Sequence, residues 1–213
     1  MERGIRSNVV KIKNMIKAII FDFGNVLYNF TNEIFLEKVS KLNGKTREEN
    51  YKLIYQESGL PKKFETGLIS EQEFYKEISK LCELNISLEE LKEIYTRDKF
   101  TPVFGMNEII KSLKNKFKIA LLSNTSEWDY KCDIEDTPEI QLMDTITLSY
   151  QVGAMKPKVE IYNDAIKKLN LLPEECVYTD DIIDYVKAAE EIGMKGIHFE
   201  NPNDFLLELN KLL

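Results

Sequence analysis

The sequence predicts an α/β protein: a doubly wound, Rossmann-like parallel sheet with a second, smaller helical unit. Two observations lead to this fold class. Short apolar runs of β-type residues alternate with segments of helical periodicity over most of the chain, which is typical of βαβ units. One stretch, residues 31–100, breaks this alternation and has only helical spacing. We therefore expect an α/β core that carries a helical insert.

The first predicted strand begins at Lys17 and ends at a carboxylate, Asp22, a pattern typical of a buried parallel strand that leads into a loop. Further strands are predicted at residues 117–122, 176–179, 196–199 and, with a weaker pattern, 144–148. Apolar residues at helical spacing predict helices at residues 107–115, 159–169, 184–191 and 203–213.

The insert is rich in lysine and glutamate and shows no convincing strand. Its apolar residues, such as Leu88 and Leu91, recur at helical spacing, and Asn43-Gly44 supplies a turn signal. The segment from Ser70 to Glu73 has the spacing of a helix capping box. The predicted organisation is a leader at residues 1–16, a core at residues 17–30 and 101–213, and a helical insert at residues 31–100.

The composition is that of a soluble globular protein, since 43% of the 213 residues are hydrophobic and 31% are charged. The length corresponds to roughly 1.4 average domains, which fits one domain with an insertion. The net charge of −7 opposes binding to nucleic acid or to an anionic membrane surface. Apolar runs are far shorter than the roughly 20 residues that span a bilayer.

The three cysteines are an odd number without CxxC spacing, which indicates neither a disulfide framework nor a zinc site. Residues 1–16 lack the continuous apolar core of a secretion signal. We expect a cytoplasmic protein, with translation starting at either Met1 or Met15. Whether it is a monomer or a homodimer stays open.

Polar residues follow the predicted strands at their carboxyl ends, where ligands bind in open parallel sheets. These residues are Asp22, Ser123, Asn124, Asp180 and Asp181. Lys156 joins them, because we expect Pro157 in the first turn of a helix, which places the lysine where that helix begins. Several carboxylates, a hydroxyl and an ammonium group in one crevice predict a magnesium-dependent phosphate site.

Each of these groups has a physical reason to be there. A carboxylate can attack phosphorus to form an aspartyl-phosphate, but its charge repels the phosphoryl oxygens unless cations intervene. Mg²⁺ accepts carboxylate and carbonyl oxygens. Lys156 would neutralise charge on the phosphoryl oxygens, and the Ser123 hydroxyl would donate a hydrogen bond to them. Asp180 and Asp181 are the candidate metal ligands.

Four segments, in order along the chain, resemble the motifs of the haloacid dehalogenase superfamily, phosphatase-like branch. They are Ile19 to Leu27, Leu121 to Thr125, Gly153 to Pro157 and Val177 to Asp181. The resemblance implies a Rossmann-like core and a helical cap between the first and second motifs, where the insert lies. It implies that Asp22 is the nucleophile, that Ser123, Asn124 and Lys156 bind and stabilise the phosphate, and that Mg²⁺ is held by Asp22, the Gly24 carbonyl, Asp180 and Asp181.

The sequence departs from this family at Gly24, where its phosphatases usually have an aspartate that serves as general acid and base. A positioned general acid or base contributes about 10²–10⁴-fold to a rate. We therefore expect slow hydrolysis of alkyl phosphates unless another residue supplies the proton. Glu65 in the insert is the first candidate for that residue. Trp128 is expected to pack either over the cleft or into a core.

The predicted function is Mg²⁺-dependent removal of phosphate from a small phosphorylated metabolite, a sugar phosphate being one candidate. Two alternatives stay open. Gly24 would fit a protein that binds a phosphorylated ligand for regulation without turning it over. A 2-haloacid dehalogenase would use the same aspartate, but that branch needs no metal, so Asp180 and Asp181 speak against it.

Overall fold

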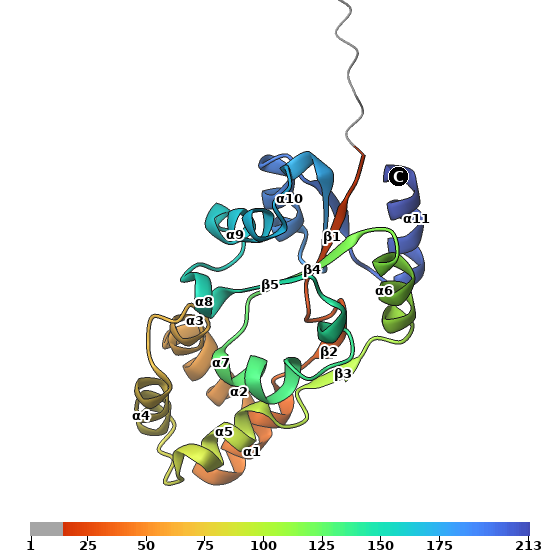
Figure 1. The fold of residues 1–213 in the computed structure, drawn as a ribbon. Helices are drawn as coiled ribbons and strands as arrows, with labels where there is room; N and C mark the ends of the chain where they lie inside the picture. Colours follow the sequence, from red (N-terminus) through yellow and green to blue (C-terminus); the bar gives the residue numbers. More distant parts are fainter. Residues whose placement is uncertain (1–14) are drawn as a thin grey trace, which may run out of the picture.

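The protein is described by a computed structural model over residues 15–213. A five-stranded parallel sheet, with strand order β5-β4-β1-β6-β7, forms its centre (Figure 1). The strands are β1 (Ala18–Phe21), β4 (Lys118–Ser123), β5 (Thr145–Leu148), β6 (Cys176–Asp180) and β7 (Lys195–His198). This confirms the doubly wound α/β fold class, and all five predicted runs are strands of this sheet.

Helices cover both faces of the sheet (Figure 1). One face packs against α6 (Met106–Lys114) and α11 (Pro202–Leu212), and the other against α9 (Val159–Leu169) and α10 (Ile183–Glu191). In β1, the side chains alternate between the layers: Ile19 belongs to the first apolar cluster and Ile20 to the second. Burial on both sides explains why the strand is apolar throughout.

The helical region lies below the sheet in Figure 1 and is built from short helices. They are α1 (Glu33–Asn43), α2 (Arg47–Tyr51), a π-helical segment (Lys52–Glu57), α3 (Leu60–Glu65), α4 (Glu71–Leu81) and α5 (Leu88–Thr96). The predicted capping box at Ser70 is present, since its side chain accepts a hydrogen bond from the Glu73 backbone and the Glu73 carboxylate accepts one from the Ser70 backbone. The boundaries proposed for the core and the insert stay a prediction.

Trp128 packs into the apolar cluster of this helical region, although it lies on α7 (Glu127–Asp129), the short helix that follows β4. It is fully buried, and its ring lies against those of Phe64, Phe74 and Tyr95 at centroid distances of 5.1, 5.4 and 5.7 Å. Its Nε1 donates a hydrogen bond to Glu71 on α4. These contacts of Trp128 connect the helical region to the core.

A two-stranded antiparallel sheet joins the two regions and was not predicted. It consists of β2 (Tyr28–Phe30) and β3 (Phe100–Pro102), so the expectation that the insert contains no strand is wrong at its last residue, Phe100. Three-residue strands are too short to show a hydrophobic period. The Phe23 ring stacks on Tyr28 and meets Phe100 edge-on, which fixes the pairing by tertiary contact.

The first fourteen residues lie outside the described part, so the predicted leader is not addressed by the structure except at Met15 and Ile16. Met15 is exposed and Ile16 is buried in the core. Within residues 15–213, every helix is too short or too polar to traverse a lipid bilayer.

Candidate active site

The loop after β1 places Asp22 at the carboxyl-terminal edge of the sheet. Its backbone N–H donates to the Thr179 carbonyl on β6, and the turn that follows is closed by bonds from Leu27 and Tyr28 to the Phe23 carbonyl. Asp22 is 8% exposed, so its carboxylate faces the cleft from a buried position.

Lys156 joins the loops of this edge. Its Nζ lies 2.6 Å from Oδ1 of Asp22 and 2.7 Å from Oδ2 of Asp180, and it is 4% exposed. The Asn124 side chain holds the Lys156 backbone, accepting from its N–H at 2.8 Å and donating to its carbonyl at 3.3 Å. Asn124 thus positions the lysine, and direct phosphate binding by this amide stays a prediction.

The expectation that Pro157 lies in the first turn of a helix is wrong. Helix α9 begins at Val159, with Lys158 as its N-cap residue, and the Lys156-Pro157 peptide is cis. Lys156 therefore projects from the loop before the helix.

The end of β6 supplies two acids with different surroundings. Asp180 is fully buried and accepts hydrogen bonds from the Ile182 backbone N–H at 2.9 Å and from the Tyr178 hydroxyl. Asp181 is half-buried and accepts a hydrogen bond from Asn25 Nδ2 at 3.0 Å. One oxygen from each of Asp22, Asp180 and Asp181 lies within 4.8 Å of the other two. The three strand-end acids form one cluster.

Burial and neighbouring charges shift the pKa values of this cluster in opposite directions. Burial raises the pKa of Asp22 to about 7, against the opposing effect of the Lys156 ammonium group. Burial alone would lower the pKa of Lys156, but the carboxylates of Asp22 and Asp180 raise it, so the lysine is a cation. Burial also raises the pKa of Asp181. Within residues 15–213, the positive charge that pairs with Asp22 and Asp180 is the Lys156 ammonium group.

These residues border a cleft of about 220 Å³ between the sheet edge and the helical region. Its lining includes the predicted residues Asp22, Gly24, Ser123, Asn124, Lys156 and Asp181, while Asp180 lies behind them. Ser123 is 3% exposed and lines the cleft. The chemical roles of these residues remain predictions.

The opposite wall holds Glu65, Lys99 and Asp129. Lys99 and Asp129 form a buried ion pair at 2.7 Å, and the Lys99 ammonium lies 3.9 Å from the centre of the Tyr95 ring. This pair was not predicted from the sequence. Neither residue stands directly at the end of a strand of the main sheet, and the pair joins positions 30 residues apart, so local sequence carries no signal for it.

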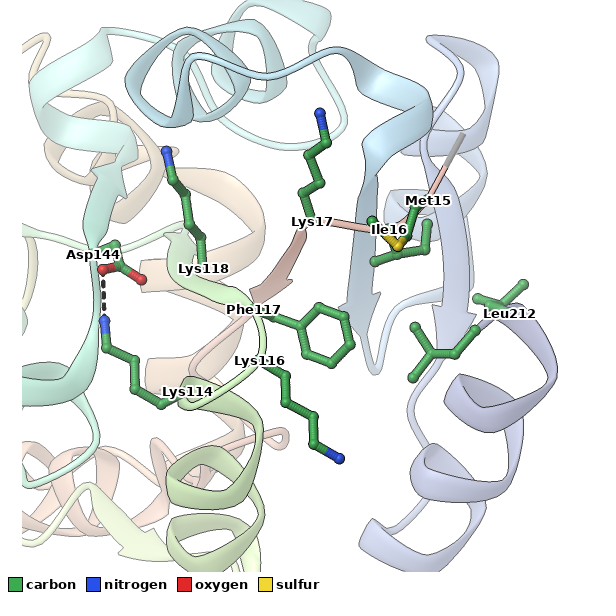
Figure 2. Close-up of a pocket in the computed structure, with 10 residues that line it drawn as sticks. Met15, Ile16, Lys17, Lys114, Lys116, Phe117, Lys118, Asp144 and Leu212 are labelled. Carbon is green, nitrogen blue, oxygen red and sulfur yellow. Dashed lines mark ion pairs between the residues drawn. The ribbon is translucent and has the colours of Figure 1, made fainter. Parts of the chain in front are cut away.

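A larger pocket of about 830 Å³ lies elsewhere, beside the start of β1 and β4 (Figure 2). Lysines surround its apolar floor, and one of them, Lys114, forms an ion pair with Asp144 that Figure 2 shows as a dashed line. Ligands of open parallel sheets bind at the carboxyl ends of strands, whereas this pocket is at the amino ends. The smaller cleft is therefore the candidate active site.

The comparison with known proteins agrees with this geometry. Over 208 residues the chain is 29% identical to a D-ribitol-5-phosphate phosphatase of Bacteroides thetaiotaomicron, which covers 93% of this chain and 99% of that protein. It is 27% identical to a phosphorylated carbohydrates phosphatase of Thermotoga maritima, with 90% of each chain covered. A crystal structure of a HAD family enzyme from Bacteroides thetaiotaomicron with magnesium and inorganic phosphate has the same fold, with a TM-score of 0.77, 24% identity, and coverage of 88% and 96% of the two chains.

The family match shows that the protein is an enzyme of the hydrolase class. The chain belongs to the haloacid dehalogenase-like hydrolases, whose family model matches residues 16–193.

Proposed function

We propose that the protein is a Mg²⁺-dependent phosphatase that acts on a small phosphorylated metabolite through an aspartyl-phosphate on Asp22. The observation that carries this proposal is the position of Asp22: buried, 2.6 Å from the Lys156 ammonium and clustered with Asp180 and Asp181. A carboxylate so placed has a cation beside it to offset its repulsion from a phosphate.

In this mechanism an oxygen of Asp22 attacks phosphorus, the bond from phosphorus to the leaving oxygen breaks, and water later hydrolyses the aspartyl-phosphate. Lys156 holds the nucleophile in place and neutralises charge on the phosphoryl oxygens. The Ser123 hydroxyl, in the lining of the cleft, donates a hydrogen bond to one of those oxygens. Asn124 acts through the lysine by fixing its backbone.

The acidic cluster fits a magnesium ion. Mg²⁺ prefers oxygen ligands, and Asp22, Asp180 and Asp181 offer three carboxylate oxygens within 4.8 Å of one another. These residues, with the Gly24 carbonyl, would hold the ion. When bound it supplies a second positive charge to stabilise the negative charge of the phosphoryl group in the transition state.

The walls of the cleft favour a small, hydroxyl-bearing substrate. Its volume of about 220 Å³ lies below the 300–1,000 Å³ range of typical ligand pockets, which favours a small substrate. Opposite Asp22 the wall carries two acids and one lysine, Glu65, Asp129 and Lys99, so a second phosphate would meet no excess of positive charge. Sugar phosphates or polyol phosphates meet these conditions, and the names of the two phosphatase relatives point the same way.

Phosphate release from a panel of sugar, polyol and aryl phosphates, measured with Mg²⁺ and with EDTA, tests the proposal. We expect Mg²⁺-dependent release that Asp22→Asn abolishes. Binding of a phosphorylated metabolite without any release would instead favour a regulatory ligand-binding protein, and release unaffected by Asp22→Asn would contradict the covalent mechanism.

A further inference from the structure

The nucleophile loop contains no side chain that can give a proton to the leaving oxygen. Gly24 has no side chain, and both ends of the Asn25 amide are occupied. Its Nδ2 donates to Asp181 at 3.0 Å, and its Oδ1 accepts from the Phe30 backbone N–H at 3.1 Å. An alkoxide leaving group needs that proton, so a donor must come from another part of the cleft.

Among the acids that line the cleft, Glu65 is the one left without an assigned partner. Asp22 is the nucleophile, and Asp181 belongs to the metal cluster. Asp129 is held by Lys99 at 2.7 Å and by the Ser126 hydroxyl at 3.0 Å. The Glu65 carboxyl makes no hydrogen bond or ion pair within residues 15–213, although it lies in the wall of the cleft.

The core holds Glu65 at this place through its backbone. Glu65 is the last residue of α3, and its carbonyl accepts a hydrogen bond from the Ser149 hydroxyl at 2.5 Å. The same hydroxyl accepts from the Thr125 N–H at 2.9 Å, two residues after Ser123. Ser149 therefore joins the backbone of Glu65 to the predicted phosphate-binding loop.

A close backbone contact strengthens this attachment. Gly67 has a φ of +66°, and a Cβ at that position would lie 2.3 Å from the carbonyl oxygen of Tyr150 on α8 (Ser149–Val152). Figure 1 shows α3 beside α8. A glycine lets the turn after Glu65 approach α8 this closely, so the turn has a fixed position over the cleft.

The environment of Glu65 suits a group that gives and takes a proton. Burial raises the pKa of the Glu65 carboxyl to about 7, the Asp129 carboxylate adds to this, and the Lys99 ammonium opposes it. An acid or base works best with a pKa near the working pH. Tyr185 also lines the cleft, but burial raises its pKa further above its usual value of 10, so it does not exchange its proton near neutral pH.

We propose that Glu65 is the general acid and base of this enzyme, in place of the aspartate absent at position 24. As Asp22 attacks and the bond from phosphorus to the leaving oxygen breaks, the protonated Glu65 transfers its proton to that oxygen and releases an alcohol. The Glu65 carboxylate then takes a proton from the water that attacks the aspartyl-phosphate, which frees phosphate and restores both carboxyl groups. This inference rests on the phosphatase function proposed above.

Glu65→Gln tests the assignment when two leaving groups are compared. We expect kcat/KM for ribitol 5-phosphate or another alkyl phosphate that the enzyme accepts to fall about 10²–10⁴-fold. The kcat/KM for 4-nitrophenyl phosphate should stay within a few-fold of wild type, because nitrophenolate departs without a proton. The variant should also release one equivalent of nitrophenol in a burst and then turn over slowly, because it lacks the base for the second step.

Glu77→Gln is the matched control. Glu77 is an exposed acid on α4, and its substitution changes the charge of the protein in the same way as Glu65→Gln. Equal losses on both substrates, or no loss on either, would overturn the assignment of Glu65. Ser149→Ala provides a second variant. It removes the hydrogen bond to the Glu65 carbonyl, so Glu65 is held less firmly, and alkyl-phosphate turnover should fall more than aryl-phosphate turnover. If wild type releases no phosphate from any substrate, the proposed phosphatase function fails together with the assignment of Glu65. If wild type hydrolyses aryl phosphates and Asp22→Asn abolishes this activity, the proposed function stands whatever the result for Glu65.

Discussion

The Asn25 amide lies 3.0 Å from the Asp181 carboxylate, and this hydrogen bond joins the loop after β1 to the loop after β6 across 156 residues of sequence. Asn25 has a φ of +55°, a left-handed conformation that asparagine tolerates better than most residues. The conformation turns its side chain so that one end meets Asp181 and the other meets the backbone of Phe30. The residue next to Gly24 therefore positions an acid and is not free to carry a proton.

Removing this amide should weaken the proposed metal site while the left-handed backbone conformation stays accessible. Asn25→Gly keeps the positive φ accessible and deletes the hydrogen bond to Asp181. Loss of such a supporting partner typically costs about 10–100-fold in metal affinity. We expect a decrease of this size in Mg²⁺ affinity measured by calorimetry. Asp184→Asn, at an exposed acid of α10, is the control and should bind Mg²⁺ like wild type; equal affinities in all three proteins would contradict the arrangement.

Asp22→Asn should abolish turnover while leaving the fold intact. The amide has the same shape, but it is a poor nucleophile and loses the ion pair with Lys156. Phosphate release should disappear, and the circular dichroism spectrum should match that of wild type. Activity within a few-fold of wild type would exclude an aspartyl-phosphate on this residue.

Gly24→Asp should restore alkyl-phosphate turnover in the Glu65→Gln background. We expect rescue of up to about 10²–10⁴-fold, because the new carboxyl stands where related phosphatases carry their acid and base. The structure leaves room for it: a Cβ on Gly24 would have its nearest contact at 3.7 Å, with Cβ of Phe30, and the backbone there does not require glycine. Kinetics of the double variant on alkyl and aryl phosphates measure the rescue, and an equal gain on both classes would argue against proton transfer.

Glu65 should lower the stability of the protein as the pH rises. The pKa of its carboxyl is about 7 in the folded protein, whereas the ordinary value for an exposed glutamate is 4.5, so between these pH values the unfolded chain binds fewer protons than the folded one. The free energy of unfolding therefore decreases from about pH 4.5 upward, by at most about 3 kcal/mol. The charged or titratable groups that face Glu65 are Lys99, Asp129, Tyr55 and Tyr95, and both tyrosines stay neutral in this range because burial raises their pKa values.

Thermal unfolding of Glu65→Gln and wild type at pH 4 and pH 8 measures this effect. The variant should melt at a higher temperature than wild type at pH 8 and at a similar temperature at pH 4. Glu77→Gln should show no such difference. A variant that melts below wild type at pH 8 would mean that the Glu65 carboxylate has a stabilising partner.

The sequence indicated the active-site edge because strand ends carry local information. A parallel strand buried on both faces must be apolar, so the first polar residue after it, as at Asp22, Ser123 and Asp180, marks the end of the strand. Because all these strands run in the same direction, their ends meet at one edge. The acids and the hydroxyl could thus be grouped without knowledge of any contact. Lys156 follows no strand directly, and it was grouped with them on an expected helix start at Pro157 that the structure does not have.

The sequence by itself determined the doubly wound α/β fold, the helical character of residues 31–100 and the residues at the sheet edge. Only the tertiary structure decided that β2 pairs with β3, that Trp128 enters the helical cluster, and that the Glu65 carboxyl lies in the cleft with no hydrogen bond or ion pair to the rest of residues 15–213. The physical reason is the range of the interactions. Hydrophobic periodicity acts within one element, whereas these features depend on how rigid elements distant in the sequence pack against one another, as the Ser149 hydroxyl and the backbone of Glu65 do across 84 residues.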